Sequence, residues 1–324
     1  MHKNYIILAH TNPEQLKRLV SRLSDGCSSF YIHIDKKSEI NAFLACFENA
    51  AHVTFIPDRV DCIWGDFSQV EATLNLINEV ISGGREGYTI FLSGQDYPIK
   101  SNREINAFLE KNSGFEFISL EHKPIQKAHY LYKERVEAYK INISSKRWDY
   151  VIVPYIFSPI DVKRTFAKFL LRKVSVQDLL LSFKKRKQPF AEHCKGPQWW
   201  AFSSNTLHKI HSYVQDNKEE LFSYYKHTIY SDEQFFHTIL WELMKRDPDI
   251  RLKDYLHYIN WEREGVELPV TFDRNDIEEL VSQPEDKLFA RKFDARYDAE
   301  ILDKLDKHLQ QQCIAAKDRN GKEP

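Results

Sequence analysis

The residues best suited to chemistry in this sequence are one carboxylate and one pair of cations. Glu233, in the stretch YSDEQFF, is a carboxylate that can take a proton from a hydroxyl group as a general base. Arg291 and Lys292, in the stretch LFARKFD, place two positive charges side by side, which suits stabilisation of a departing diphosphate. The alternative for Glu233 is structural, because an acid in the first turn of a helix favours that helix by itself.

The sequence contains no convincing motif for a metal or a cofactor. Many enzymes that transfer sugars from nucleotides hold a metal with Asp-x-Asp after a strand, but the Asp247-Pro248-Asp249 of this chain follows a helical pattern and is typical of a turn. The sequence contains no G-x-G-x-x-G after its first strand, no G-x-x-x-x-G-K-[ST] and no G-x-S-x-G. We therefore expect no cofactor and no essential metal, with lysines and arginines neutralising the leaving group.

The elements that must position these residues alternate between strand and helix over the first 120 residues. Short β-branched and aromatic runs predict strands, and the apolar periodicity between them predicts amphipathic helices. This βαβαβ order predicts an α/β fold, with a mainly parallel, Rossmann-like sheet flanked by helices. The predicted strands are 5–9, 30–35, 52–56 and 88–92, and the predicted helices are 13–23, 38–48 and 68–81.

Polar residues follow these strands directly. Ligands of parallel sheets bind at the carboxyl ends of the strands, so these residues are candidates for a binding site. Each of them alone equally suits the turn that ends a strand, but together they lie on one edge of the sheet. They are His10, Asp35, Asp58, Gln95 and Asp96.

The second half of the chain is more irregular. From about residue 130 to 189 it becomes basic and aromatic, and residues 161–187 hold nine lysines and arginines against two aspartates. This segment suits peripheral contact with an anionic membrane or a groove for an acidic acceptor, and the alternative is a surface helix packed on the core. GPQWWAF predicts a turn into a buried strand, with Trp200 inward and Trp199 towards the cleft. A helix is predicted over 205–217.

Composition excludes some classes of function. The 46 lysines and arginines balance 47 acids, so no overall positive field favours nucleic acid as a partner. The five cysteines are scattered and odd in number, which indicates reduced thiols. No signal peptide or membrane-spanning run is evident in the 324 residues, so we expect a cytoplasmic protein, with any membrane contact peripheral at the inner face. We expect one domain over 1–314, divided near 125 into a nucleotide-binding and an acceptor half, and a frayed tail over 315–324.

Six motifs in order resemble the core-2/I-branching N-acetylglucosaminyltransferase family, which also includes the protein O-xylosyltransferases. The resemblance runs over most of the chain. Each motif alone carries little weight, and their common order makes the resemblance specific. The motifs are YIHIDKKS, WGDFSQV, FLSGQDYPIKS, GPQWWAFSS, YSDEQFF and LFARKFD.

The resemblance implies a GT-A fold and inverting transfer from a UDP-sugar, of N-acetylglucosamine or xylose, to a glycan hydroxyl without an essential metal. It assigns Glu233 as the catalytic base and Lys292 as a cation for the diphosphate. It also implies that Gln95 and Asp96 contact the donor sugar or brace the loop. The remaining expected contacts are His10, Asp35, Trp64 and Arg291 for the donor, and Trp199, Asp232 and Trp261 for the acceptor.

The chain departs from the family pattern in two ways. The branching enzymes carry a second cation where this chain has LPVT, residues 268–271, so either Arg274 or Arg291 compensates or the diphosphate is held more weakly. The chain also lacks an evident anchor and paired cysteines, which suggests a bacterial-type cytoplasmic relative. The missing cation keeps open an alternative function, a non-catalytic glycan- or membrane-binding scaffold that retains the fold.

Overall fold

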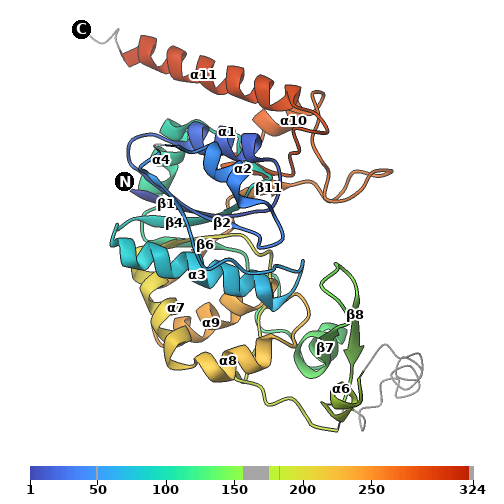
Figure 1. Cartoon of the computed structure of the whole chain (residues 1–324). Coiled ribbons are helices and arrows are strands. Elements are labelled where there is room, and N and C mark those ends of the chain that lie inside the picture. Colours follow the sequence, from blue (N-terminus) through green and yellow to red (C-terminus); the bar gives the residue numbers. More distant parts are fainter. Residues whose placement is uncertain (49, 156–174, 182, 321–324) are drawn as a thin grey trace.

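The main sheet has the strand order β10-β6-β9-β4-β1-β2-β3. The protein is described here by a computed structural model, which covers all residues except 49, 156–174, 182 and 321–324 (Figure 1). Within these residues, β9 alone runs antiparallel to its neighbours in this sheet. The strands are β1 (Lys3–Ala9), β2 (Ser28–Ile34), β3 (Val53–Phe55), β4 (Tyr88–Ser93), β6 (Phe115–Ile118), β9 (Trp200–Ser203) and β10 (Arg251–Lys253).

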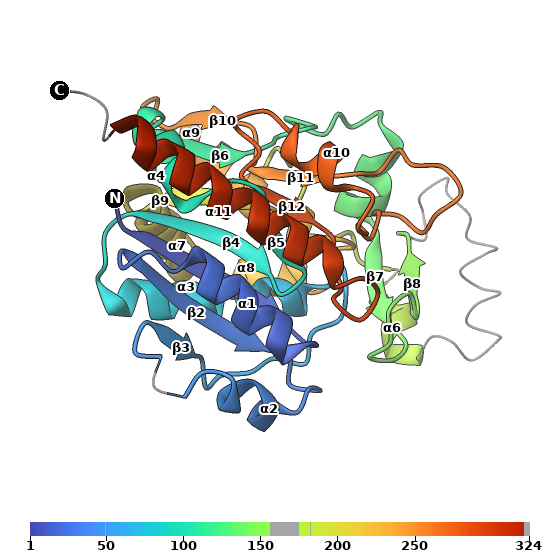
Figure 2. The ribbon, with the colours of Figure 1, turned by 90° about the horizontal axis from the view of Figure 1, so that it is seen from above.

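Helices cover both faces of this sheet. Figure 1 shows α3, α7, α8 and α9 on one face, and Figure 2 shows α1 and α11 crossing above the strands on the other. Strand β1 is apolar on both sides, because Tyr5 and Ile7 pack in one core and Ile6 in the opposite one. The helices are α1 (Pro13–Leu23), α2 (Ile40–Ala45), α3 (Phe67–Gly83), α4 (Asn102–Lys111), α7 (Ser204–Asp216), α8 (Lys218–Tyr225), α9 (Phe235–Met244), α10 (Ile277–Val281) and α11 (Glu300–Asn320).

A small second sheet at the site pairs one strand from the first half of the chain with two strands from the second half. It has the order β11-β12-β5, where β5 is Asp96–Pro98, β11 is His257–Ile259 and β12 is Phe289–Arg291. Strand β12 pairs antiparallel with β5, in a register that sets Arg291 opposite Asp96. This pairing brings the predicted cations next to the carboxyl end of β4.

A hairpin of β7 (Tyr139–Asn142) and β8 (Tyr150–Val153) stands beside the main sheet (Figure 1). Asp66 connects the hairpin to the start of α3. The Asp66 carboxylate accepts from the backbone N–H of Ser68 at the start of α3, and from Lys140 Nζ at 2.6 Å and Asn142 Nδ2 at 2.9 Å. The buried Lys140 ammonium is thereby paired, which removes most of the cost of its burial.

The predicted α/β class with a mainly parallel sheet is confirmed. Every strand and helix predicted in the first 120 residues is present, with ends shifted by a few residues at most. The predicted strand after the double tryptophan is β9, and the helix predicted over 205–217 is α7. Strand β9 enters the centre of the first-half sheet, and β12 pairs with β5, so the second half of the chain completes both sheets.

Helix α11 extends into the predicted tail, and the basic segment is described only in part. Helix α11 continues to Asn320 and so includes residues 315–320. Most of the segment 161–187, namely 161–174 and 182, lies outside the described residues, and α6 is Val176–Leu181. Arg186 is buried and donates to carbonyls of Val136 and Ala138, so it is not available to a membrane. No described helix is long and apolar enough to cross a bilayer.

Candidate active site

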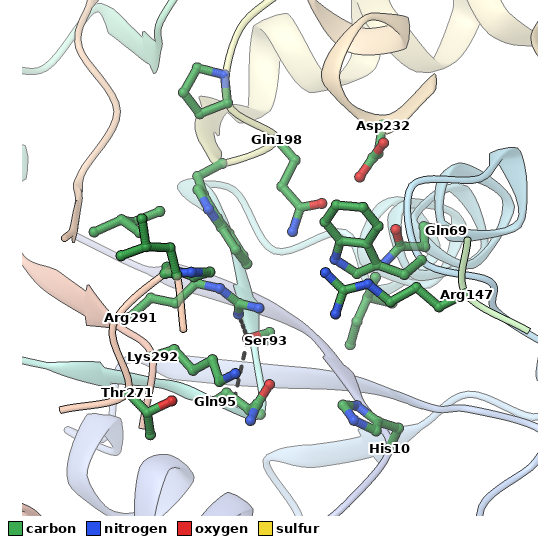
Figure 3. A pocket seen from close by; sticks show the side chains of 18 of the residues that line it. His10, Gln69, Ser93, Gln95, Arg147, Gln198, Asp232, Thr271, Arg291 and Lys292 are labelled. Atoms are coloured by element: carbon green, nitrogen blue, oxygen red, sulfur yellow. Dashed lines mark hydrogen bonds between the residues drawn. The ribbon is translucent and has the colours of Figure 1, made fainter. Parts of the chain in front are cut away.

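A cleft of about 1340 Å³ opens at the carboxyl ends of β1, β2 and β4 (Figure 3). Its walls come from these strand ends, from the loop between β7 and β8, from the segment before α9 and from residues around β12. Nearly all the residues predicted for the site line this one cleft. They are His10, Asp35, Trp64, Gln95, Trp199, Asp232, Glu233, Trp261, Arg291 and Lys292.

Glu233 ends the short 3-10 helix η2 (Ser231–Glu233) and is partly exposed to the cleft. Its carboxylate accepts a hydrogen bond from Arg135 Nη1 at 2.7 Å. Arg135 belongs to the π-helix η1 (Tyr132–Glu137) and is itself buried, so the contact fixes the carboxylate from behind. Helix α9 begins only at Phe235, so Glu233 precedes that helix and does not lie in its first turn.

Asp232 lies beside Glu233 and also lines the cleft. Burial, followed by the negative charge of Glu233, raises the pKa of Asp232 to about 7. Its Oδ1 atom is buried without a hydrogen-bond partner among the described residues. Figure 3 shows Asp232 on the side of the cleft opposite Arg291 and Lys292. The site therefore presents a carboxylate held by an arginine next to a carboxyl group that titrates near neutrality.

Asp96 is a brace for Arg291. The Asp96 carboxylate is fully buried and accepts from Ser93 N at 2.7 Å, from Ser93 Oγ at 2.9 Å and from Arg291 Nη1 at 3.0 Å. Asp96 is not part of the cleft lining, so the expected direct contact with a donor is wrong for this residue. Gln95, its neighbour, does face the cleft (Figure 3).

Lys292 follows Arg291 and points into the same part of the cleft (Figure 3). Among the residues that the structure describes, no carboxylate pairs with its ammonium group. Thr271, in the segment 268–271 where the family carries a second cation, lines the cleft near Lys292 (Figure 3). Arg274 does not compensate, because it lies outside the lining and pairs with Asp298 and Glu300.

The tryptophans separate into exposed and buried ones. Trp64 and Trp261 line the cleft with 40% and 55% of their surface exposed, as a platform for a ring requires. Trp199 is only 3% exposed, since the His257 ring stacks on it at 4.7 Å and the Arg291 guanidinium lies 4.9 Å from its centre. Trp199 therefore supports Arg291; it belongs to the cleft lining, as predicted, and its contact with an acceptor stays a prediction. Trp200 points into the core, as predicted.

The strand ends supply the remaining polar groups. His10 follows β1 at the cleft, where burial lowers the pKa of its imidazole despite the opposing charge of Asp35. Asp35 follows β2 and accepts from the backbone N–H of Lys37 at 2.9 Å, which holds the turn after that strand. Asp58, the candidate after the third strand, is not in the lining.

No group of three or more histidine, cysteine, aspartate or glutamate side chains in the described part of the chain is arranged to hold a metal ion. Asp247-Pro248-Asp249 forms a turn, in which Asp247 accepts from the backbone N–H of Asp249 at 3.1 Å and from Lys209. This motif lies outside the cleft.

Several residues in and behind the cleft lining were not predicted from the sequence. Arg135 had no signal beyond a basic, aromatic stretch, because its pairing with Glu233 spans 98 residues. For Arg147 and Trp148, the sequence offered one signal, which is that an arginine and a tryptophan stand side by side in a loop. Gln69, in the motif WGDFSQV, lines the cleft and accepts from the Gly65 N–H.

Comparisons with known proteins agree with the six motifs. Xylosyltransferase 2 of Rattus norvegicus is 24% identical over 94% of this chain and 33% of its own length. Xylosyltransferase 1 of Homo sapiens is 21% identical over 94% of this chain and 30% of its own length, so the chain spans about a third of these relatives. S. aureus TarS aligns with 44% of this chain and 25% of its own, at 10% identity and a TM-score of 0.28. The model of the Core-2/I-Branching enzyme family matches residues 4–283, and the chain therefore belongs to this family.

Proposed function

We propose that the protein is a glycosyltransferase that moves a sugar from a UDP-sugar to a hydroxyl of a glycan or glycoconjugate, with inversion at the anomeric carbon. The observation that carries the proposal is the shared cleft, whose lining includes Glu233 and the cations Arg291 and Lys292. Asp232, the neighbour of Glu233 in the chain, lies across the cleft from both cations (Figure 3). The relatives named xylosyltransferases favour xylose as the sugar, with N-acetylglucosamine as the alternative.

In this reaction Glu233 takes the proton of the acceptor hydroxyl while that oxygen attacks the anomeric carbon. The bond from this carbon to the diphosphate oxygen breaks, and the diphosphate gains one negative charge. Lys292 and Arg291 stabilise that charge, and Arg291 is held in place for this by Asp96. Arg135 keeps the Glu233 carboxylate oriented towards the cleft.

The remaining assignments use the other residues of the lining. His10, Asp35 and Gln95 at the strand ends serve the donor, as does Trp64 before α3. The exposed Trp261, after β11, provides an apolar face for an acceptor sugar, and Asp232 provides a carboxyl group that can hydrogen-bond to a hydroxyl.

Replacement of Glu233 by Gln tests the base. We expect transfer to fall by about 100-fold or more, because general-base catalysis contributes on this scale, while the affinity for UDP changes by less than about twofold. Glu262→Gln is the matched control, since Glu262 is exposed and outside the cleft lining. Transfer by Glu233→Gln within a few-fold of the unchanged protein would show that the base is misassigned.

We also propose that transfer needs no metal, since side-chain cations stand where the leaving diphosphate would be. Turnover of the donor measured with and without EDTA tests this point, and we expect equal rates. Activity that is lost in EDTA and restored by manganese would contradict it.

The alternative, a non-catalytic scaffold, is favoured by the absence of a lysine or arginine from the segment 268–271, where the family carries a second cation. A calorimetric titration with UDP separates the two functions. Saturable binding supports the transferase, whereas a chain that binds acceptor glycans but no UDP is the scaffold.

A further inference from the structure

The loop between β7 and β8, residues 143–149, forms a wall of the cleft through Ser145, Arg147 and Trp148. The loop is closed across its base, where the Ile143 N–H donates to the Asp149 carbonyl at 2.8 Å and Ser144 Oγ to Asp149 Oδ2 at 2.5 Å. The hairpin that carries the loop is held at the start of α3 by Asp66, as described above. The backbone position of Arg147 is therefore fixed by these hydrogen bonds.

Aromatic rings fix the direction of the Arg147 side chain. Its guanidinium carbon lies 4.1 Å from the ring centre of Trp64 and 5.0 Å from that of Trp148, within the range of cation–π attraction. Trp148 has a φ of 67°, uncommon for a residue with a side chain, and its ring packs 4.7 Å from Trp64 and 6.2 Å from Tyr230. The backbone thus adopts a costly conformation that keeps this loop against the cleft.

The other cations of the lining are mostly neutralised. Arg147 and Lys292 are the lysines and arginines of the lining that have no carboxylate partner among the residues that the structure describes. Because stacking on a ring uses the face of a guanidinium, the N–H donors at the edge of Arg147 stay available to an anion. The neutralised cations are Lys37, Lys195, Arg263, Arg291 and Arg296, which pair with Asp61, Glu121, Asp276, Asp96 and Asp294.

Arg147 comes from the β7–β8 loop and Arg291 and Lys292 from the wall around β12, and the three side chains point toward one another in the cleft (Figure 3). Like charges that converge in this way repel, unless an anion lies between them. A diphosphate carries several negative charges and gains one more when the sugar leaves. Of the two expected cations, Arg291 is already paired with Asp96, which partly neutralises its charge, and Thr271 adds no charge.

We propose that Arg147 is a further catalytic residue, which binds the diphosphate of the donor from the β7–β8 loop and supplies the second cation that the segment 268–271 lacks. This inference rests on the proposed function, because it needs a nucleoside diphosphate in the cleft. It adds a donor contact from an element that also borders the carboxylates, through the packing of Trp148 on Tyr230.

The test compares UDP with uridine, which lacks the diphosphate, by calorimetric titration of the full chain. Arg147→Gln should bind UDP about tenfold or more weakly, the scale of one charge-assisted hydrogen bond, and Arg147→Lys should keep part of that affinity. Uridine affinity should be the same in all variants. Lys146→Gln is the matched control, since Lys146 is exposed on the same loop and outside the lining, and it should bind both ligands as the unchanged protein does.

Two results would overturn the assignment of Arg147. One is UDP affinity of Arg147→Gln within twofold of the unchanged protein, which would leave the guanidinium only its stacking on Trp64. The other is an equal loss of UDP and uridine affinity, which would show that the substitution affects binding of the uridine and not of the diphosphate. Failure of the unchanged protein to bind UDP would instead overturn the proposed function together with this inference.

Discussion

The fully buried Asp96 is the best place to test how the cation wall is held. Its two carboxylate oxygens accept three hydrogen bonds, from Ser93 N and Oγ and from Arg291. In Asp96→Asn an NH₂ group replaces one of these oxygens. Depending on which oxygen is replaced, either the Ser93 amide or the Arg291 guanidinium then faces another donor in place of an acceptor. The substitution also removes the charge that pairs with Arg291.

The expected cost follows from this loss. Removal of one partner from a buried ion pair costs about 3–5 kcal/mol, and Arg291 is 17% exposed, so we take the lower end, about 3 kcal/mol. For a chain of this length such a loss lowers the melting temperature by about 4–5 °C. Urea denaturation monitored by circular dichroism measures the free energy, and Asp249→Asn, in an exposed turn, is a control that should change it by less than about 0.5 kcal/mol.

The pH dependence gives the sign of the effect. Burial alone would raise the pKa of Asp96, but the neighbouring His257 ring and the Arg291 guanidinium outweigh it and lower that pKa. A lowered pKa contributes stability above the unfolded value of 3.8, which is lost as the pH falls through the folded value. The difference between the unchanged protein and Asp96→Asn should thus be full at pH 7 and shrink below about pH 4.

A difference in unfolding free energy below 1 kcal/mol at pH 7 would refute the brace. If Asp96→Asn instead kept its stability and lost only affinity for UDP, Asp96 would be a direct donor contact. The two roles are therefore separated by one variant and two measurements.

Two further predictions concern the carboxylate wall. Gly65→Ala should lower the free energy of unfolding by about 2 kcal/mol and reduce transfer, because Gly65 has a φ of 65° and its Cβ would lie 2.8 Å from the Tyr230 ring. Gly26→Ala is the control, because Gly26 has a φ of 81° with open space around it, so its substitution adds backbone strain without a clash. An equal loss of unfolding free energy in both variants would show that the clash with Tyr230 contributes nothing. Asp232→Asn should gain stability relative to the unchanged protein between pH 5 and pH 8. Since burial and then Glu233 raise the pKa of Asp232 to about 7, the folded protein keeps a proton that the unfolded chain has released above about pH 4, and its stability falls as the pH rises. Equal urea midpoints for the variant and the unchanged protein at both pH values would contradict this.

Local sequence patterns predicted the first half of the fold well. Strands β1, β2 and β4 are long apolar runs that end in polar turns, so their place and the cleft at their carboxyl ends follow from the sequence. The same apolar character identified β9 as buried, but it does not specify direction, and the antiparallel insertion between β4 and β6 was not predicted. The β7–β8 hairpin was missed because its strands are short and Lys140 is buried only through its pairing with Asp66.

The candidate site was predictable where a residue acts through its own type and place in the chain. Glu233 and Lys292 are examples, since an acid or a cation near a turn is visible in the sequence. Arg135 and Arg147 depend on contacts with distant segments, and their pattern resembles that of any surface arginine. Trp199 and Asp96 were placed in the right region, but only packing shows that both hold Arg291 and that Asp96 is buried behind the lining.

The pairing of β12 with β5 also bears on the order in which the protein acquires its site. Arg291 reaches its place only after strand β12 has found β5, almost 200 residues earlier in the chain, and contacts between such distant residues form slowly. During synthesis the first half can begin to fold around β1, β2 and β4 while the ribosome still holds the cation pair. Until residues 291 and 292 leave the ribosome, the nascent chain therefore has a cleft that lacks Arg291 and Lys292, and this wall is completed after the rest of the site has been made.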